Sequence, residues 1–316
     1  MELIPQEKQE GRRAVPRTWQ PVRPEEATKL TDSRLQLHHA AQLCASAGIS
    51  FLPHLPDDSH TTLEWVPALG GLFSHLIPAR TPFRVGARPI KFALLIVDDE
   101  NTSIAEYRLH GRTITDARDW IRAQVKSLGA DGSRYTLTRH YEIPRHDVAI
   151  GESFDASDPS HFEELSKWLG NSTALLESVA RTTRRSTELR CSPRHLDIST
   201  RIKVAAGRTI DIGLQPGDGY YDEPYFYVRM NPSPAAARTR SRPLWGSGTW
   251  HTYQWVGAVL CGSRLGAAAS QERQIREFLD SAMSACRALL RDLDSRRSPQ
   301  SSTRPPYPHP PMGRSD

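Results

Sequence analysis

Two alternating stretches, HLDISTRIKV and RTIDIGLQ, constrain the fold of this chain more than any other feature. Side chains of a strand alternate between its two faces, so the apolar residues of each stretch must share one face. A three-residue loop that ends at Gly207 places Ile202 opposite Ile210, whereas a two-residue loop would place Ile202 opposite Asp211. Glycine suits the positive φ with which such loops end. The buried face therefore predicts an antiparallel hairpin in one register.

The opposite face of this hairpin is polar. It pairs Arg201 with Asp211, and it carries His195 and Asp197 two residues apart on the first strand, from 195 to 204. One interpretation is the solvated side of a sheet with a cross-strand ion pair, and it is the one we favour. The other is an acid–base site, because a histidine beside a carboxylate can transfer protons near neutral pH.

Aromatic residues gather further along the chain. Nine of the 24 Phe, Trp and Tyr residues lie between positions 220 and 255. Tyr225 and Tyr227 share one strand face, and His251 and Trp255 share a face of the next predicted strand. Aromatic walls with a few polar groups suit a ligand surface, but cross-strand packing in a core explains them as well, and we favour core packing.

The order of elements predicts an α+β fold of mainly antiparallel sheet framed by helices. The predicted strands cover residues 61–69, 72–78, 91–99, 103–110, 134–143, 195–204, 208–215, 223–230 and 249–260. Four helices are predicted. The first is capped by Asp32 or Ser33 and runs to Ala47, with Gly48 ending it, and the third begins at Pro159 after its cap Asp158. The other two cover residues 115–128 and 271–293. The order of one helix, about four strands and one helix thus occurs twice along the chain. This indicates either two related halves packed together or a single α+β domain.

The limits of the folded core are predicted from changes in amino-acid composition along the chain. Residues 1–30 and 295–316 are rich in Pro, Arg, Glu and Ser and lack hydrophobic periodicity, so we expect disordered tails there. The α+β core then covers residues 31–294, with possible halves 31–147 and 148–294.

Composition and missing motifs exclude several classes of function. The net charge is +5, but no basic run with interleaved aromatics occurs, and the nearest stripe, Arg181 to Arg194, begins at a helix end that favours cations anyway. This argues against nucleic acid as a partner. No apolar run approaches the ~18 residues of a membrane span, and the four dispersed cysteines suit buried thiols, so we expect a cytoplasmic protein. No metal-ligand spacing and no nucleotide-binding motif occurs, so neither metal nor cofactor is predicted.

The segment ELRCSPRHL, followed by a strand and the turn Gly207-Arg208, carries a resemblance. With FALLIVDDENTSIAEYRLHGRTI, YFYVRMNPSP and the final REFLDSA, it makes the chain from Leu35 to Asp294 resemble a bacterial family of domains of unknown function. The resemblance implies a shared fold and a bacterial origin. It implies no reaction.

Two functional hypotheses remain open, and whether the protein is an enzyme is not decided. The first is a module that binds a small molecule or a protein through the sheet of the second half. Its expected ligand-binding residues are Arg201, Asp211, Tyr225, Tyr227, His251 and Trp255. The second is a metal-independent hydrolase with His195 as general base, oriented by Asp197.

Overall fold

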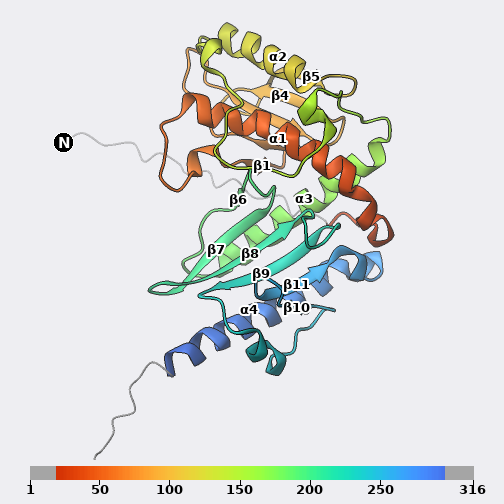
Figure 1. Cartoon of the computed structure of the whole chain (residues 1–316), viewed down its shortest axis with the longest axis vertical. Coiled ribbons are helices and arrows are strands. Elements are labelled where there is room, and N and C mark those ends of the chain that lie inside the picture. The colour runs from red at the N-terminus through yellow and green to blue at the C-terminus, as the bar shows by residue number, and fades with distance from the viewer. Residues whose placement is uncertain (1–18, 296–316) are drawn as a thin grey trace, which may run out of the picture.

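The computed structural model describes residues 19–295, which form two antiparallel sheets and four α-helices (Figure 1). This confirms the α+β class. In chain order, the elements are a helix, five strands and a helix, followed by a helix, six strands and a helix. None of the helices described is long and apolar enough to cross a membrane.

Each half contributes one sheet. The helices are α1 (Thr31–Phe51), α2 (Ile114–Ser127), α3 (Pro159–Thr182) and α4 (Gln271–Ser295). In spatial order, the first sheet consists of β1 (Glu64–Val66), β2 (Gly71–Phe73), β3 (Arg84–Arg88), β4 (Ala93–Val97) and β5 (Ser103–Arg108). The second consists of β10 (Thr249–His251), β11 (Gly257–Cys261), β9 (Tyr225–Asn231), β8 (Arg208–Gln215), β7 (Ile198–Ala205) and β6 (Arg190–Cys191).

The hairpin β7–β8 has the predicted register. Ile202 pairs with Ile210 and Arg201 with Asp211, and Gly207 in the loop has a φ of 66°. The apolar residues of both strands face α3 and α4, which cover one side of the second sheet (Figure 1). Burial of one face therefore selected the register, as expected.

The CSPRH segment joins the two halves. Cys191 and Leu63 exchange two backbone hydrogen bonds of 2.7 and 2.9 Å, which bridge the edge of the second sheet to the start of the first. Two residues later, the carbonyl of Pro193 accepts hydrogen bonds from His38 Nε2 at 2.9 Å and Gln42 Nε2 at 2.7 Å, both on α1. The most specific motif of the sequence is thus a structural joint.

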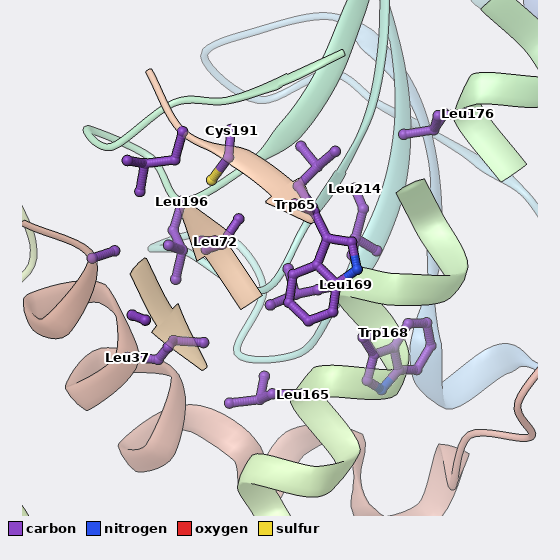
Figure 2. Close-up of a cluster of buried hydrophobic side chains, with 14 of the residues drawn as sticks. Leu37, Trp65, Leu72, Leu165, Trp168, Leu169, Leu176, Cys191, Leu196 and Leu214 are labelled. Carbon is purple, nitrogen blue, oxygen red and sulfur yellow. The ribbon is translucent and has the colours of Figure 1, made fainter. Parts of the chain in front are cut away.

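One apolar core serves both halves (Figure 2). It includes Leu37 of α1 and Leu72 of β2 from the first half, and Trp168 of α3 and Leu214 of β8 from the second. Trp65 of β1 packs between these groups with 6% exposure. Because the cluster is continuous across the joint, each half completes the other's core.

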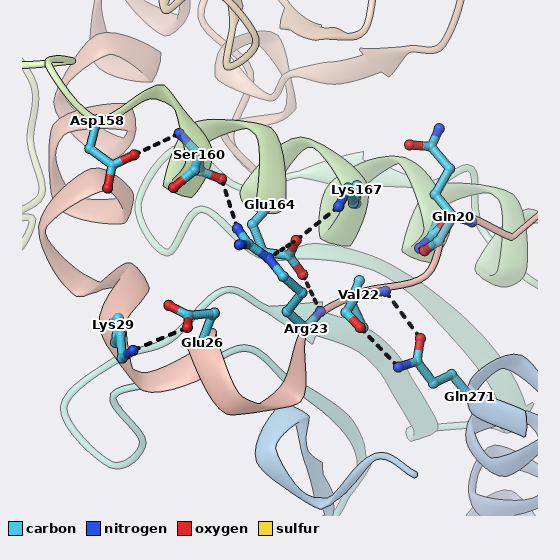
Figure 3. Close-up of polar contacts among 11 residues, drawn as sticks. Gln20, Val22, Arg23, Glu26, Lys29, Asp158, Ser160, Glu164, Lys167 and Gln271 are labelled. Carbon is cyan, nitrogen blue, oxygen red and sulfur yellow. Dashed lines mark hydrogen bonds and ion pairs between the residues drawn. The ribbon is translucent and has the colours of Figure 1, made fainter. Parts of the chain in front are cut away.

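The expected tail boundary at residue 30 is wrong, because residues 19–30 pack on the core (Figure 3). The backbone of Val22 exchanges hydrogen bonds with the Gln271 side chain, at 3.1 Å to its oxygen and 2.9 Å from its nitrogen. The backbone N–H of Arg23 donates to Glu164, a carboxylate that α3 buries completely. The remainder of the expected tails, 1–18 and 296–316, lies outside the described residues.

The first helix is longer than predicted. Asp32 and Ser33 lie inside α1 and do not cap it, and Gly48 does not end it. A side chain at Gly48 would collide with the backbone carbonyl of His60, so this glycine serves the close approach of a loop to the helix. By contrast, Asp158 caps α3 at the predicted position, accepting a hydrogen bond from the backbone of Ser160 at 2.9 Å.

Two strand predictions are wrong, and two strands of the structure were not predicted. The segment 134–143 forms no strand, because its backbone bonds to helix side chains: Thr136 N–H donates to Ser50 Oγ at 3.0 Å, and the Tyr135 carbonyl accepts from Arg122 at 2.9 Å. The segment 249–260 is two strands, β10 and β11, with Gln254 at a φ of 62° in the turn between them. Strands β3 and β6 were not predicted.

All four cysteines are buried and none is in a disulfide. Burial raises the pKa of Cys286 to about 12 and that of Cys261 to about 11. Burial also raises the pKa of Cys44 and, together with the nearby Asp197 carboxylate, that of Cys191. These thiols therefore pack as small apolar groups and are poor nucleophiles.

We expect the protein to lose stability on acidification between pH 6.5 and about pH 4, because burial lowers the pKa of both His38 and His39 to about 4. In that window the unfolded chain binds protons that the folded chain does not, so the free energy of unfolding falls as pH falls. Each histidine contributes up to about 1.4 kcal/mol per pH unit. Urea unfolding across the window measures the slope. The slope should flatten in the variant His38→Gln, and a slope identical to that of the parent protein would contradict this assignment.

Candidate functional site

The second sheet presents one face to the helices and one away from them. On β7, β8, β9 and β11 the even-numbered residues belong to the shared core, and the odd-numbered residues point to the other side, called here the open face. The open face carries four of the predicted ligand-binding residues on its central strands: Arg201, Asp211, Tyr225 and Tyr227. His251 of β10 and Trp255 of the following turn extend it beyond β11. The structure thus brings all six together on one surface.

An acid–arginine group occupies one end of the open face. The Arg201 guanidinium donates to both oxygens of Asp211, from Nε at 2.7 Å and from Nη2 at 3.1 Å. This confirms the predicted cross-strand pair, and the bond to Asp211 raises the pKa of Arg201. Arg229 of β9 adds a third bond to the same carboxylate at 3.3 Å. Two guanidinium groups therefore flank one carboxylate, and the group carries a net positive charge.

Two tyrosine–carboxylate pairs occupy the middle. The Tyr227 hydroxyl donates to Asp197 Oδ2 at 2.6 Å, and the Tyr225 hydroxyl donates to Asp218 Oδ2 at 2.6 Å. Gly213 makes the first pair possible, because a side chain there would lie 2.7 Å from the Tyr227 hydroxyl that crosses it. In both tyrosines, burial and the neighbouring carboxylate raise the pKa above its usual range. Both rings are therefore neutral and fixed in place.

Aromatic rings cover the β10–β11 end. His251 stacks on Trp255 with ring centres 4.2 Å apart, and Tyr220 meets the Trp255 ring edge-on at 6.3 Å. His251 Nε2 bonds the Tyr253 carbonyl at 2.6 Å, and because a carbonyl only accepts, this nitrogen carries the proton. His251 Nδ1 then accepts from the Tyr221 hydroxyl at 2.9 Å. Both ring nitrogens are occupied, so His251 acts as an aromatic wall.

His195 and Asp197 do not form the predicted pair. The strand β7 begins at Ile198, and His195 lies in the preceding turn, where Leu196 has a φ of 59°. The alternation that would put both side chains on one face therefore does not extend to them. His195 is exposed, and Asp197, which is 8% exposed, bonds to Tyr227. Among the described residues, no hydrogen bond or ion pair joins the two side chains.

The sequence did not single out Asp218, Tyr221 or Arg229 as site residues. Parity does place Arg229 on the strand face of Tyr225 and Tyr227, but Arg229 was not chosen as a ligand-binding residue. Asp218 and Tyr221 lie in the irregular segment between β8 and β9, where no periodicity exists to assign a face.

We expect Tyr227→Phe to lower the free energy of unfolding by about 1–3 kcal/mol, because it leaves the buried Asp197 carboxylate without its hydroxyl donor. Thermal or urea unfolding measures the change. The matched control is Tyr253→Phe, whose side chain is 68% exposed. Equal stability of the two variants would show that the Asp197 carboxylate does not depend on this bond, and would return Asp197 to consideration as a reactive group.

No protein-family model, no curated protein and no solved structure matches this chain. The resemblance to a bacterial family of domains of unknown function stays a prediction.

Proposed function

We propose that this protein is a cytoplasmic binding module that docks a partner protein on the open face, and that the partner presents acidic side chains together with an aromatic or apolar anchor. The observation that carries the proposal is the joining of tyrosine, tryptophan and arginine side chains on the sheet face opposite α3 and α4, where Arg201, Arg229 and Tyr220 are exposed and Tyr225, which is 4% exposed, packs beneath them. Those three residue types are enriched among the residues that dominate binding energy at protein interfaces.

The extent of the face favours a protein over a small molecule. Its residues come from five neighbouring strands, β7, β8, β9, β11 and β10. Neighbouring strands lie about 4.8 Å apart, so the face spans roughly 19 Å. A drug-sized ligand would be enclosed by a cleft, whereas a surface of this width matches the footprint of a polypeptide.

The rings on this face are pre-organised. Tyr221, Tyr225 and Tyr227 each use their hydroxyl in a bond to another residue of the surface. Side chains that are already fixed lose little conformational freedom when a partner binds, which leaves more of the interaction energy for affinity. Tyr220, which is 41% exposed, offers contact area beside the stacked Trp255.

The charge that faces solvent is positive. The Arg201 and Arg229 side chains are 56% and 51% exposed, whereas the Asp211 side chain between them is 11% exposed. Acidic groups on a partner therefore complement this surface. Nucleic acid is a less suitable partner than an acidic protein, because the sequence holds no basic run with interleaved aromatic residues.

A defined polymer tests the proposal. A fluorescent random copolymer of glutamate and tyrosine supplies both required features, polyglutamate supplies the charge alone, and oligothymidylate represents single-stranded nucleic acid. We expect fluorescence anisotropy to show saturable binding of the copolymer, weaker binding of polyglutamate and weakest binding of the oligonucleotide. Arg229→Ala should weaken copolymer binding several-fold, and Arg145→Ala, an exposed arginine of the first half, should not.

Two results would overturn the proposal. One is tighter binding of oligothymidylate than of the copolymer, with a steep salt dependence, which would identify a nucleic-acid surface. The other is equal loss of copolymer binding in Arg229→Ala and Arg145→Ala, which would show that the polymer binds through overall charge and not through the open face.

A further inference from the structure

A cavity of about 510 Å³ lies at the joint between the two halves, away from the open face. It is bounded by β1 and β2 of the first sheet, by β6 and β7 of the second, and by the C-terminal part of α3. Its volume falls within the range typical of small-molecule sites. The backbone bridge between Leu63 and Cys191 forms part of its lining, so its walls belong to the best-connected part of the fold.

Buried apolar side chains from both sheets form part of the lining of this joint cavity. Phe73 is completely buried and Trp65 is 6% exposed, and Ile198 closes the side of the second sheet. Figure 2 shows the Trp65 indole extending from the first sheet toward Leu169 of α3. An apolar wall of fixed aromatic and branched side chains favours a flat, apolar ligand body.

One polar group in this wall is free to bond a ligand. Among residues 19–295, no hydrogen bond joins the indole N–H of Trp65 to another residue, and this nitrogen is not one of the polar atoms buried without a partner, so it keeps contact with solvent. A donor that is bonded only to solvent can exchange that contact for a hydrogen bond to a ligand. A ligand atom that accepts a hydrogen bond would satisfy it.

The charged residues of the joint cavity are already paired. Arg181 lies 3.8 Å from Glu177, and Arg190 lies 3.3 Å from Glu188. Glu64 bonds Arg84 at 2.6 Å. Burial also lowers the pKa of His75, which favours its neutral form. The lining therefore offers no uncompensated charge, and a charged ligand would have to break one of these pairs.

We propose that the joint cavity binds a flat, uncharged heteroaromatic molecule whose ring acceptor takes the hydrogen bond of the Trp65 indole N–H. This site is independent of the open face. Since both sheets line the cavity, such a ligand would contact both halves at once.

Quinoline and N-methylquinolinium test the proposal on the full-length protein. The two probes have the same fused ring, but quinoline is neutral with a free acceptor nitrogen, whereas the methylated ion is charged and has no acceptor. Ligand-detected NMR titration should show saturable binding of quinoline and none of N-methylquinolinium. Trp65→Phe keeps a ring and removes the N–H, so it should weaken quinoline binding about 3–10-fold. Trp245→Phe, at a tryptophan that is 65% exposed and does not line the cavity, should leave binding unchanged.

A blocking variant gives a second, independent readout. Ala180 lines the cavity from α3, and Ala180→Phe should fill it and abolish quinoline binding while the melting transition is retained. Absence of saturable quinoline binding to the parent protein would overturn the proposal. So would equal binding of both probes, or an unchanged quinoline affinity in Trp65→Phe. The conservative Trp65→Phe variant decides the matter if Ala180→Phe does not fold.

Discussion

Trp168→Ala should lower the free energy of unfolding by about 3–5 kcal/mol, the usual loss when a fully buried tryptophan is removed from a core. Trp168 of α3 is completely buried, 6.5 Å from the Phe226 ring of β9 between ring centres. It also packs against Gly262, where a side chain would lie 3.0 Å from the indole. Because one core serves both halves, we expect a single unfolding transition, shifted as a whole, by circular dichroism in urea.

The matched control is Trp245→Ala, at the tryptophan that is 65% exposed, for which we expect a change within about 0.5 kcal/mol. Trp168→Phe should cost less than Trp168→Ala, since it keeps a ring and removes an indole N–H that is buried without a partner among the described residues. Two separate transitions, with only one shifted by Trp168→Ala, would contradict the shared core.

Glu164→Ala should cost about 3 kcal/mol. Its carboxylate is completely buried on α3 and binds three donors: the backbone N–H of Arg23, the Arg23 guanidinium at 3.3 Å and the Lys167 ammonium at 3.1 Å (Figure 3). Its removal leaves the Arg23 N–H without its acceptor and opens a cavity beneath the N-terminal segment. Arg23 and Lys167 are partly exposed and can regain water, which keeps the loss below that of a fully buried pair.

Hydrogen exchange localises this effect. In Glu164→Ala, amides of residues 19–30 should exchange faster, because Glu164 holds that segment against α3. Glu163→Ala removes the same type of residue at the neighbouring exposed position and should change neither stability nor exchange. Unchanged protection of residues 19–30 in Glu164→Ala would show that the bonds of Val22 to Gln271 suffice to hold the segment.

The parts of the fold that could be predicted from the sequence are those in which a clear hydrophobic periodicity allows only one way to bury the apolar side chains. The register of β7 and β8 was predictable because Ile202 and Ile210 have to share the buried side, and only one loop length allows this. The start of α3 was predictable because Asp158 and Pro159 act locally.

Other parts depended on contacts that no local pattern reveals. Gly86 in β3 lies against the Phe73 ring. In the sequence, this glycine suggests an interruption of a strand, whereas in the structure it allows a close contact between two strands. The segment 134–143 has an alternating pattern, but side chains from α1 and α2 satisfy its backbone first. The His195–Asp197 pair failed for a similar reason, since a left-handed residue between them ends the alternation.

For the site, parity placed Arg201 and Asp211 together on the hairpin and Tyr225 and Tyr227 together on the next strand, and the structure shows that both pairs lie on the same face of the sheet. Their bonding partners were harder to foresee. Asp218 comes from an irregular segment, and Asp197 reaches Tyr227 only because Gly213 leaves room for the ring between them.

The proposal that the open face docks an acidic protein is tested most directly by comparing two tryptophans. Trp255 belongs to the open face and stacks on His251, whereas Trp245 is exposed outside it. The measurement is the affinity of the glutamate–tyrosine copolymer for the parent protein, for Trp255→Ala and for Trp245→Ala, each checked for an intact melting transition. Loss of an interface anchor predicts binding about tenfold weaker in Trp255→Ala and unchanged in Trp245→Ala. Equal affinities in all three proteins would contradict the open face as the docking surface.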